Sequence, residues 1–120
     1  MKTIYLCTPH KLGDFNRELA ERIGRESFKI VGAFSHTPQD VTKKDIFDRN
    51  VELLKSADVF IAVFKDYGKD LTAEVGMAFA WNMPRFGIDY TALESDIMSF
   101  YGIGRIIKPE QLEETLKEYR

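Results

Sequence analysis

The sequence predicts an α/β fold of three layers, in which a doubly wound, five-stranded parallel sheet lies between two layers of helices. Short apolar runs alternate along the chain with longer segments in which apolar residues recur at helical spacing. Connections that contain a helix join strands in parallel, and the expected strand order is 2-1-3-4-5. The length of 120 residues suits one domain, residues 1–120.

Five apolar runs are predicted to be the strands. The run VFIAVF, residues 59–64, is the most hydrophobic of the chain and is expected at the centre of the sheet. The first run has no charge in its interior, which is typical of a strand buried on both faces. The predicted strands are residues 2–7, 28–34, 59–64, 85–88 and 104–107.

Five further segments are predicted to be helices, with a loop at residues 35–42. Asp14, behind Gly13, is the candidate N-cap of the first helix, and Thr42 is that of the second. Pro84 ends the third helix, and Pro109 opens the last one at its first position. The predicted helices are residues 15–25, 43–56, 71–81, 92–101 and 109–119.

The predicted topology indicates where a ligand binds. Flavodoxin-like and Rossmann-like sheets bind ligands at the carboxyl ends of their strands, near the point where the strand order reverses. In this chain that point lies between the first and third strands. The loops at residues 8–14 and 65–71 are therefore expected to form the site.

Composition argues against several classes of partner. The formal net charge of -2 provides no basic excess, so nucleic acid is not expected as a partner. No apolar run approaches the roughly 20 residues of a membrane-spanning helix, and no membrane association is expected. A single cysteine, Cys7, and a start without a signal-peptide pattern indicate a cytoplasmic protein.

Motifs narrow the chemistry further, because both G-x-G-x-x-G and the P-loop are missing. Gly13 stands where a phosphatase loop that begins at Cys7 needs arginine, and Thr8-Pro9 stands where a phosphorelay receiver needs acidic residues. A flavin-binding electron carrier shares the topology, but the Ser/Thr-rich phosphate loop is missing. His10 and His36 lie far apart in sequence, so neither a metal nor another cofactor is expected.

Three carboxylates cluster at the second expected loop. Asp66, Asp70 and Glu74 lie within nine residues, and Glu74 interrupts an otherwise apolar helix, two residues before Gly76. One interpretation is structural: Glu74 is a first-turn glutamate favoured by the helix dipole, and Gly76 admits a close neighbouring strand. The other is functional, with Glu74 as a reactive group.

Three segments, in this order, resemble the nucleoside 2-deoxyribosyltransferase family. They are IYLCTPHKLGDFNRELAERI, then NVELLKSADVFIAVF, then the T-x-E-x-G-M-A-x-A run at residues 72–80, and the resemblance spans about residues 2–98. It implies that Glu74 is the nucleophile that attacks the anomeric carbon of a 2′-deoxyribosyl group, and that Tyr5 orients it. Tyr5 is equally well explained as a core aromatic residue.

The chain departs from the family pattern at two places. The family's sugar-binding aspartate corresponds here to Asn50, and the usual D-x-G-T segment is replaced by GKDLT, residues 68–72. Either Asp70 or Asp66 is then the residue that contacts the base.

The loop after the first strand resembles the branch of the family that hydrolyses 2′-deoxynucleoside 5′-monophosphates. Lys11 and Gly13 correspond to its phosphate-binding loop, although Lys11 is also explained as a solvated loop lysine. Ser95 and Met98 correspond to the segment that family members lend to a neighbour's pocket, so a homodimer or higher homo-oligomer is expected. The remaining candidates for substrate binding are Thr8, Pro9, His10 and Gly76.

The sequence therefore predicts cleavage or transfer at the N-glycosidic bond of small-molecule deoxynucleosides or deoxynucleotides. The alternative is a non-catalytic module that binds or senses nucleotides on the same fold. Both interpretations place the ligand beside Glu74.

Overall fold

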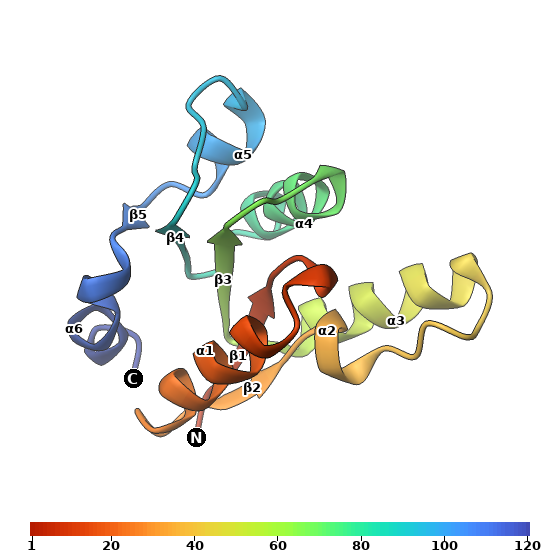
Figure 1. The fold of residues 1–120 in the computed structure, drawn as a ribbon, viewed down its shortest axis with the longest axis horizontal. Helices are drawn as coiled ribbons and strands as arrows, with labels where there is room; N and C mark the ends of the chain where they lie inside the picture. Colours follow the sequence, from red (N-terminus) through yellow and green to blue (C-terminus); the bar gives the residue numbers. More distant parts are fainter.

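The computed structural model describes residues 1–120 and contains one five-stranded sheet with the order β2-β1-β3-β4-β5 (Figure 1). All four neighbouring strand pairs are parallel, which confirms the predicted fold class and strand order. The strands are β1 (Thr3–Cys7), β2 (Lys29–Val31), β3 (Val59–Phe64), β4 (Arg85–Asp89) and β5 (Ile106–Ile107).

Helices cover both faces of the sheet. Side chains alternate along β3, so Ile61 and Val63 face α1 and α6, while Phe60 and Phe64 face α3, α4 and α5. All six residues of β3 are buried, as expected for the central strand. The helices are α1 (Asp14–Gly24), α2 (Ala33–His36), α3 (Lys43–Ser56), α4 (Lys69–Ala80), α5 (Ile97–Gly102) and α6 (Leu112–Lys117), with short 3₁₀ turns η1 (His10–Leu12) and η2 (Pro109–Gln111).

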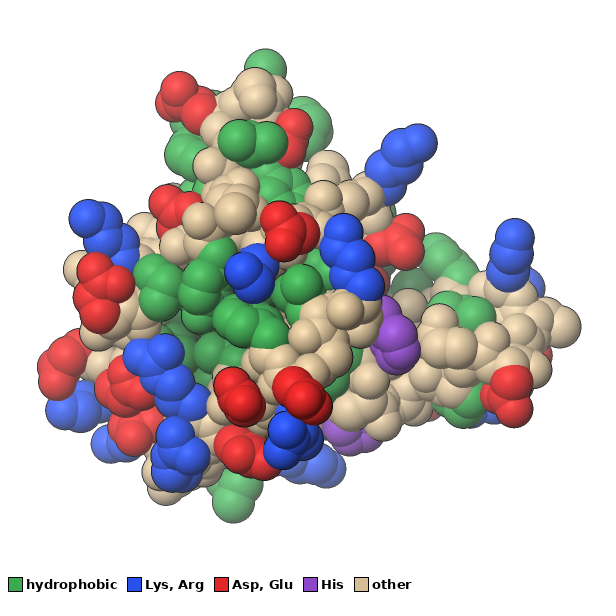
Figure 2. Space-filling view, viewed as in Figure 1, with side chains coloured by type: hydrophobic (Ala, Val, Ile, Leu, Met, Phe, Trp, Pro, Cys, Tyr) green, Lys and Arg blue, Asp and Glu red, His purple; other side chains and the backbone are tan.

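Figure 1 shows that α2, the loop after it and the first turns of α3 extend beyond the sheet as an arm. Thr42 caps α3 as predicted, because its side chain accepts a hydrogen bond from the Asp45 amide at 3.2 Å. Basic and acidic side chains are interspersed over the face shown in Figure 2. None of the six α-helices combines the length and the apolar character that a bilayer-spanning segment requires.

The prediction for the first helix is wrong at its start. Gly13 is the N-cap, with φ 55°, and Asp14 is already the first helical residue. The Asp14 carboxylate pairs with Arg17 at 3.2 Å and does not cap the helix. A left-handed backbone suits glycine, so the turn into α1 is made one residue earlier than predicted.

The second strand is shorter than predicted. It ends at Val31, and residues 33–36 form the helical turn α2, in which the amides of Ser35 and His36 both donate to the Gly32 carbonyl. A Cβ atom on Gly32 would lie 2.7 Å from the Leu6 carbonyl oxygen, so the chain passes β1 too closely for another residue type. The apolar pair Ala33-Phe34 thus belongs to a turn, although its composition is typical of a strand.

The remaining boundaries differ in smaller ways. Helix α4 begins two residues earlier than predicted, at Lys69, and β5 contains only two residues. Residues 92–96 form a loop before α5, where the Ala92 amide donates to Asp89 and Tyr67 donates to Asp96. The closing helix is divided into η2 and α6.

Candidate functional site

A cleft lies at the carboxyl ends of β1 and β3, where the topology predicts it, and Figure 2 shows a hollow between the arm and the rest of the molecule. It consists of two lobes, of about 340 Å³ and about 420 Å³. Five residues line both lobes and so mark their junction: Gln39, Ile46, Asn50, Asp70 and Glu74.

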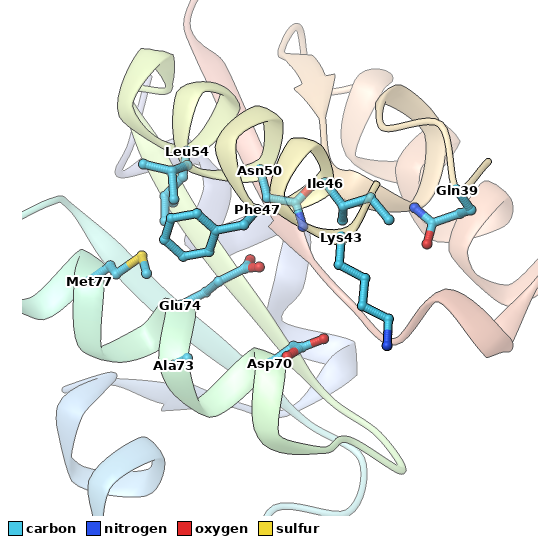
Figure 3. A pocket seen from close by; sticks show the side chains of 11 residues that line it. Gln39, Lys43, Ile46, Phe47, Asn50, Leu54, Asp70, Ala73, Glu74 and Met77 are labelled. Carbon is cyan, nitrogen blue, oxygen red and sulfur yellow. The ribbon is translucent and has the colours of Figure 1, made fainter. Parts of the chain in front are cut away.

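The smaller lobe, here called the polar lobe, lies over the ends of β1 and β3. Its other lining residues are Tyr5, Leu6, Cys7, Thr8, Pro9, His10, Lys11, Ala33, Phe34, Asp66, Gly68 and Leu71. The larger lobe, here called the apolar lobe, lies between α3 and α4. Its other lining residues are Lys43, Phe47, Val51, Leu54, Ala73 and Met77, and most of the side chains of this lobe are shown in Figure 3.

Glu74 is the sixth residue of α4, so it lies beyond the first turn of the helix. This placement contradicts the interpretation of Glu74 as a first-turn glutamate stabilised by the helix dipole, because that effect is confined to the first turn. The first-turn acid is Asp70. In Figure 3 the Glu74 side chain points from α4 into the space below α3.

Tyr5 and Cys7 lie on the same face of β1, two residues apart, and both face Glu74. Burial raises the pKa of Glu74 above its usual value, and the nearby Asp70 adds to the rise. Hydrogen bonding from the Tyr5 hydroxyl and the Cys7 thiol lowers the same pKa and so opposes the rise. Side chains of β1, and not the terminus of α4, therefore stabilise the ionised Glu74 carboxylate.

The same surroundings keep Tyr5 and Cys7 protonated. Burial and the neighbouring Glu74 raise the pKa of both groups well above their usual values. Cys7 is 5% exposed and Tyr5 is 1% exposed, so both side chains belong to the core. Both groups therefore remain protonated, and neither is activated as a nucleophile.

The two candidate base-contacting carboxylates differ in position. Asp70 lines both lobes and lies one helical turn before Glu74, whereas Asp66 lines the polar lobe alone. Asp66 has φ 47°, a left-handed conformation, and its amide donates to the Thr91 hydroxyl at 2.9 Å. The bond to Thr91 holds the turn after β3 in place beside the cleft.

The loop after β1 contributes Thr8, Pro9, His10 and Lys11 to the polar lobe. Asn16 of α1, 2% exposed, anchors this loop: it accepts from the Thr8 hydroxyl at 2.7 Å and donates to the Pro9 carbonyl at 2.9 Å. The two anchoring bonds hold Thr8 and Pro9 at the edge of the lobe.

Four of the expected site residues lie outside the cleft. Gly13 lines a separate hollow beside α1 and β2. Gly76 is exposed and a Cβ atom there would contact nothing within 4 Å, so no neighbouring strand approaches it closely. Ser95 and Met98 are exposed before and within α5, and Met98 is 77% exposed.

The cleft also contains residues that sequence reasoning missed. Gln39 and Phe34 come from the arm, Ile46 and Phe47 come from α3, and Met77 comes from α4. One sequence signal was available for α3, whose residues 43, 46, 47, 50, 51 and 54 recur at helical spacing and form a single face toward the apolar lobe. No group of three or more His, Cys, Asp or Glu side chains is arranged to hold a metal ion.

Neither a protein-family model nor a curated protein sequence matches this chain. A conserved protein from Enterococcus faecalis V583 has a similar crystal structure, with a TM-score of 0.85 and 15% identity over 100% of this chain and 99% of that chain. A 2-deoxyribosyltransferase from Bacillus psychrosaccharolyticus matches with a TM-score of 0.73 and 16% identity, over 98% of this chain and 92% of that one.

A 2-deoxyribosyltransferase from Leishmania mexicana matches with a TM-score of 0.61 and 14% identity, over 73% of this chain and 64% of that one. Identities this low establish a shared fold. The chain thus has the three-layer α/β fold that is also found in 2-deoxyribosyltransferases.

Proposed function

We propose that this protein cleaves or transfers at the N-glycosidic bond of 2′-deoxynucleosides or their 5′-monophosphates, through a covalent glycosyl-enzyme on Glu74. The supporting observation is the position of Glu74, at the junction of the polar and apolar lobes with Tyr5 and Cys7 behind it. A substrate that occupies both lobes places a bond near its middle beside this carboxylate. The fold shared with 2-deoxyribosyltransferases supports the same chemistry.

The proposed reaction has two steps. A Glu74 oxygen forms a bond to the anomeric carbon while the bond from that carbon to the base nitrogen breaks, and the base leaves with the electron pair and takes up a proton. The nitrogen of a second base, or a water oxygen, then attacks the anomeric carbon and loses a proton. The electron pair of the ester bond returns to Glu74.

Other cleft residues have proposed roles on either side of this carboxylate. Asp70 is the better placed of the two candidates to contact the base, because it lines both lobes. Thr8, His10 and Lys11 border the polar lobe, where Lys11 is the proposed partner of a 5′-phosphate. Neither a metal ion nor another cofactor takes part in the proposed steps.

A nucleotide-binding protein without turnover is the second candidate. It is favoured by Asn50, which stands at the place of the family's aspartate. Both candidates predict nucleotide binding in the cleft, so turnover is the measurement that separates them.

The test is incubation with each common 2′-deoxynucleoside and its 5′-monophosphate, with and without a second free base, followed by chromatography. We expect release or exchange of the base, and covalent labelling of Glu74 by a slow 2-fluoro-substituted substrate. Glu74→Gln should lower the rate by about four orders of magnitude. Binding without turnover of any of these compounds would establish the second candidate.

Two variants sharpen this experiment. Glu18→Gln makes the same chemical change at an exposed position of α1, away from the cleft, and should leave the rate unchanged. If Lys11 binds the phosphate, Lys11→Ala should weaken the binding of monophosphates more than the binding of nucleosides, by about 1–3 kcal/mol. An equal loss of binding free energy for monophosphates and nucleosides would exclude that role for Lys11.

A further inference from the structure

The Asn50 side chain is held in one orientation by a residue behind the wall of the cleft. Thr37, at the end of α2 and 6% exposed, donates its hydroxyl hydrogen to the Asn50 Oδ1 atom at 2.7 Å. Thr37 lines neither lobe of the cleft, whereas Asn50 lines both. The bond therefore joins the loop of the arm to α3 and restricts rotation of the amide.

The opposite end of the amide is free. Asn50 Nδ2 has no hydrogen-bond partner within the protein, and no fully buried polar side-chain atom lacks a partner, so this nitrogen reaches the open space of the cleft. In Figure 3 it lies on the side of Asn50 that faces Glu74 and Asp70. The wall thus offers two N–H donors opposite two carboxylates.

Thr37 also holds a second cleft residue. Its carbonyl oxygen accepts a hydrogen bond from Gln39 Nε2 at 3.0 Å, and Gln39 lines both lobes together with Asn50. One buried residue therefore fixes two amide side chains of the wall, one through its hydroxyl and one through its backbone.

We propose that Thr37 is a positioning residue that makes Asn50 present its NH₂ group, and not its carbonyl oxygen, to an exocyclic oxygen of the substrate's sugar, O3′ or O5′. This inference rests on the proposed function, which places the sugar beside Glu74. A carboxylate at this position only accepts hydrogen bonds, whereas an amide held in this way only donates them. The site is therefore built for a sugar oxygen that acts as an acceptor.

The orientation itself is tested without turnover, by NMR of the Asn50 side-chain amide in the free protein. We expect both Nδ2 protons to exchange readily with water, because both face the cleft, and we expect the amide to lose its fixed orientation in Thr37→Val. Protection of one of these protons in the native protein would show that the nitrogen faces Thr37, which would overturn the proposal. This readout remains decisive if no substrate is turned over, an outcome that would count against the proposed function alone.

The consequence for recognition is tested with variants of nearly unchanged shape. Thr37→Val removes the hydroxyl without altering charge, and Asn50→Asp replaces the donor by an acceptor; each should lower kcat/KM about tenfold or more, the effect of a lost hydrogen bond. Thr37→Ser keeps the hydroxyl and should retain the native value. An Asn50→Asp enzyme as active as the native one would contradict the proposal.

Substrate analogues identify the oxygen concerned. 3′-Deoxy and 5′-deoxy analogues each lack one exocyclic sugar oxygen. With one of these analogues, Thr37→Val should no longer lower kcat/KM, because the hydrogen bond from Asn50 to that oxygen is already missing. A Thr37→Val effect of equal size on the parent substrate and on both analogues would overturn the recognition of an exocyclic sugar oxygen by Asn50.

Discussion

Glu74 is subject to two opposed influences at the scale of one residue. Burial favours its neutral form, while hydrogen bonding from Tyr5 and Cys7 favours the anion that the proposed reaction needs. The net effect raises the pKa, so the folded protein holds this proton more tightly than the unfolded chain does. The free energy of unfolding should therefore depend on the ionisation of this half-buried carboxyl group.

The first prediction concerns this dependence. A carboxyl group with a raised folded-state pKa contributes stability that is present below its unfolded pKa and is lost as the pH rises through the folded pKa. Glu74→Gln resembles the protonated form at every pH. It should match the native melting temperature in acid and exceed it at neutral pH, although activity is lost. Thermal unfolding of both proteins across pH checks this, and a lower melting temperature of the variant at neutral pH would contradict it.

The second prediction concerns Cys7. Cys7→Ala removes one donor to Glu74, so the pKa of Glu74 should rise further and the acidic limb of the kcat/KM profile should move to higher pH. Cys7→Ser supplies a stronger donor and should move that limb the other way. A limb that stays in place in both variants would show that the thiol does not act on Glu74. The raised pKa of Cys7 also predicts slow alkylation of the folded protein at neutral pH.

Packing between elements depends on one glycine of β4. A Cβ atom on Gly87 would lie 2.4 Å from the ring of Phe64 on the neighbouring strand β3. Phe64 fills the space that a side chain at residue 87 would need, and it belongs to the core that supports α4. A change at this position therefore affects the helix that carries Glu74.

The third prediction follows from this contact. Gly87→Ala should destabilise the protein by about 1–3 kcal/mol, as overpacking of a filled core does. Gly76→Ala is the matched control: it makes the same change on the exposed side of α4, where a Cβ atom meets nothing within 4 Å, and should stabilise by about 0.5–1 kcal/mol. Urea unfolding of the two variants measures both effects. Equal effects on stability would show that the Phe64 contact is not limiting.

The fourth prediction concerns the pair that joins α1 to the last segment of the chain. The Arg22 guanidinium bonds to Glu113 and to the Pro109 carbonyl, and lowers the pKa of Glu113 to about 2. A lowered carboxyl pKa contributes stability above the unfolded pKa that is lost as the pH falls through the folded value. Glu113→Gln should therefore cost up to about 1 kcal/mol at neutral pH, a small value because the pair is partly exposed.

The pH dependence identifies this contribution. The difference in free energy of unfolding between the native protein and Glu113→Gln should shrink towards zero on acidification from about pH 4.5 towards pH 2. Glu114→Gln is the control, because Glu114 makes only an exposed pair with Lys117 on the same helix and should change little. A stability difference for Glu113→Gln that persists at pH 2 would exclude the charge as its source.

At the scale of the whole molecule, large apolar side chains remain exposed on one face of α5. Ile97, Met98 and Tyr101 lie at helical spacing and are each at least 59% exposed. A monomer rarely leaves apolar side chains gathered in this way. We propose that a second copy of the chain covers this surface.

The fifth prediction is the resulting mass. Light scattering at micromolar concentration should give at least twice 13.8 kDa. Met98→Glu places a charge on the proposed interface and should shift the protein towards the monomer, whereas Glu18→Gln on the other side of the sheet should not. A native protein that is monomeric under these conditions and cleaves substrate would exclude both the interface and a site shared between copies.

The sequence by itself determined the fold class, the strand order and the central strand. Each depends on local patterns: the uncharged run at residues 59–64, the helical spacing after Thr42 and the length of the connections are all contained within short segments. The sequence also singled out Glu74, because a carboxylate in an apolar helix is visible without knowledge of its neighbours.

Only the tertiary structure decided what surrounds Glu74. Glu74 faces Tyr5 and Cys7 of β1 and does not lie at the helix terminus. Gln39 of the arm lines the cleft, and the bond from Thr37 fixes the orientation of the Asn50 amide. These contacts join segments far apart along the chain, and hydrophobic periodicity specifies which face of an element is buried but not which side chain of another element it meets. The positions of the donors and acceptors in the cleft are therefore set by packing.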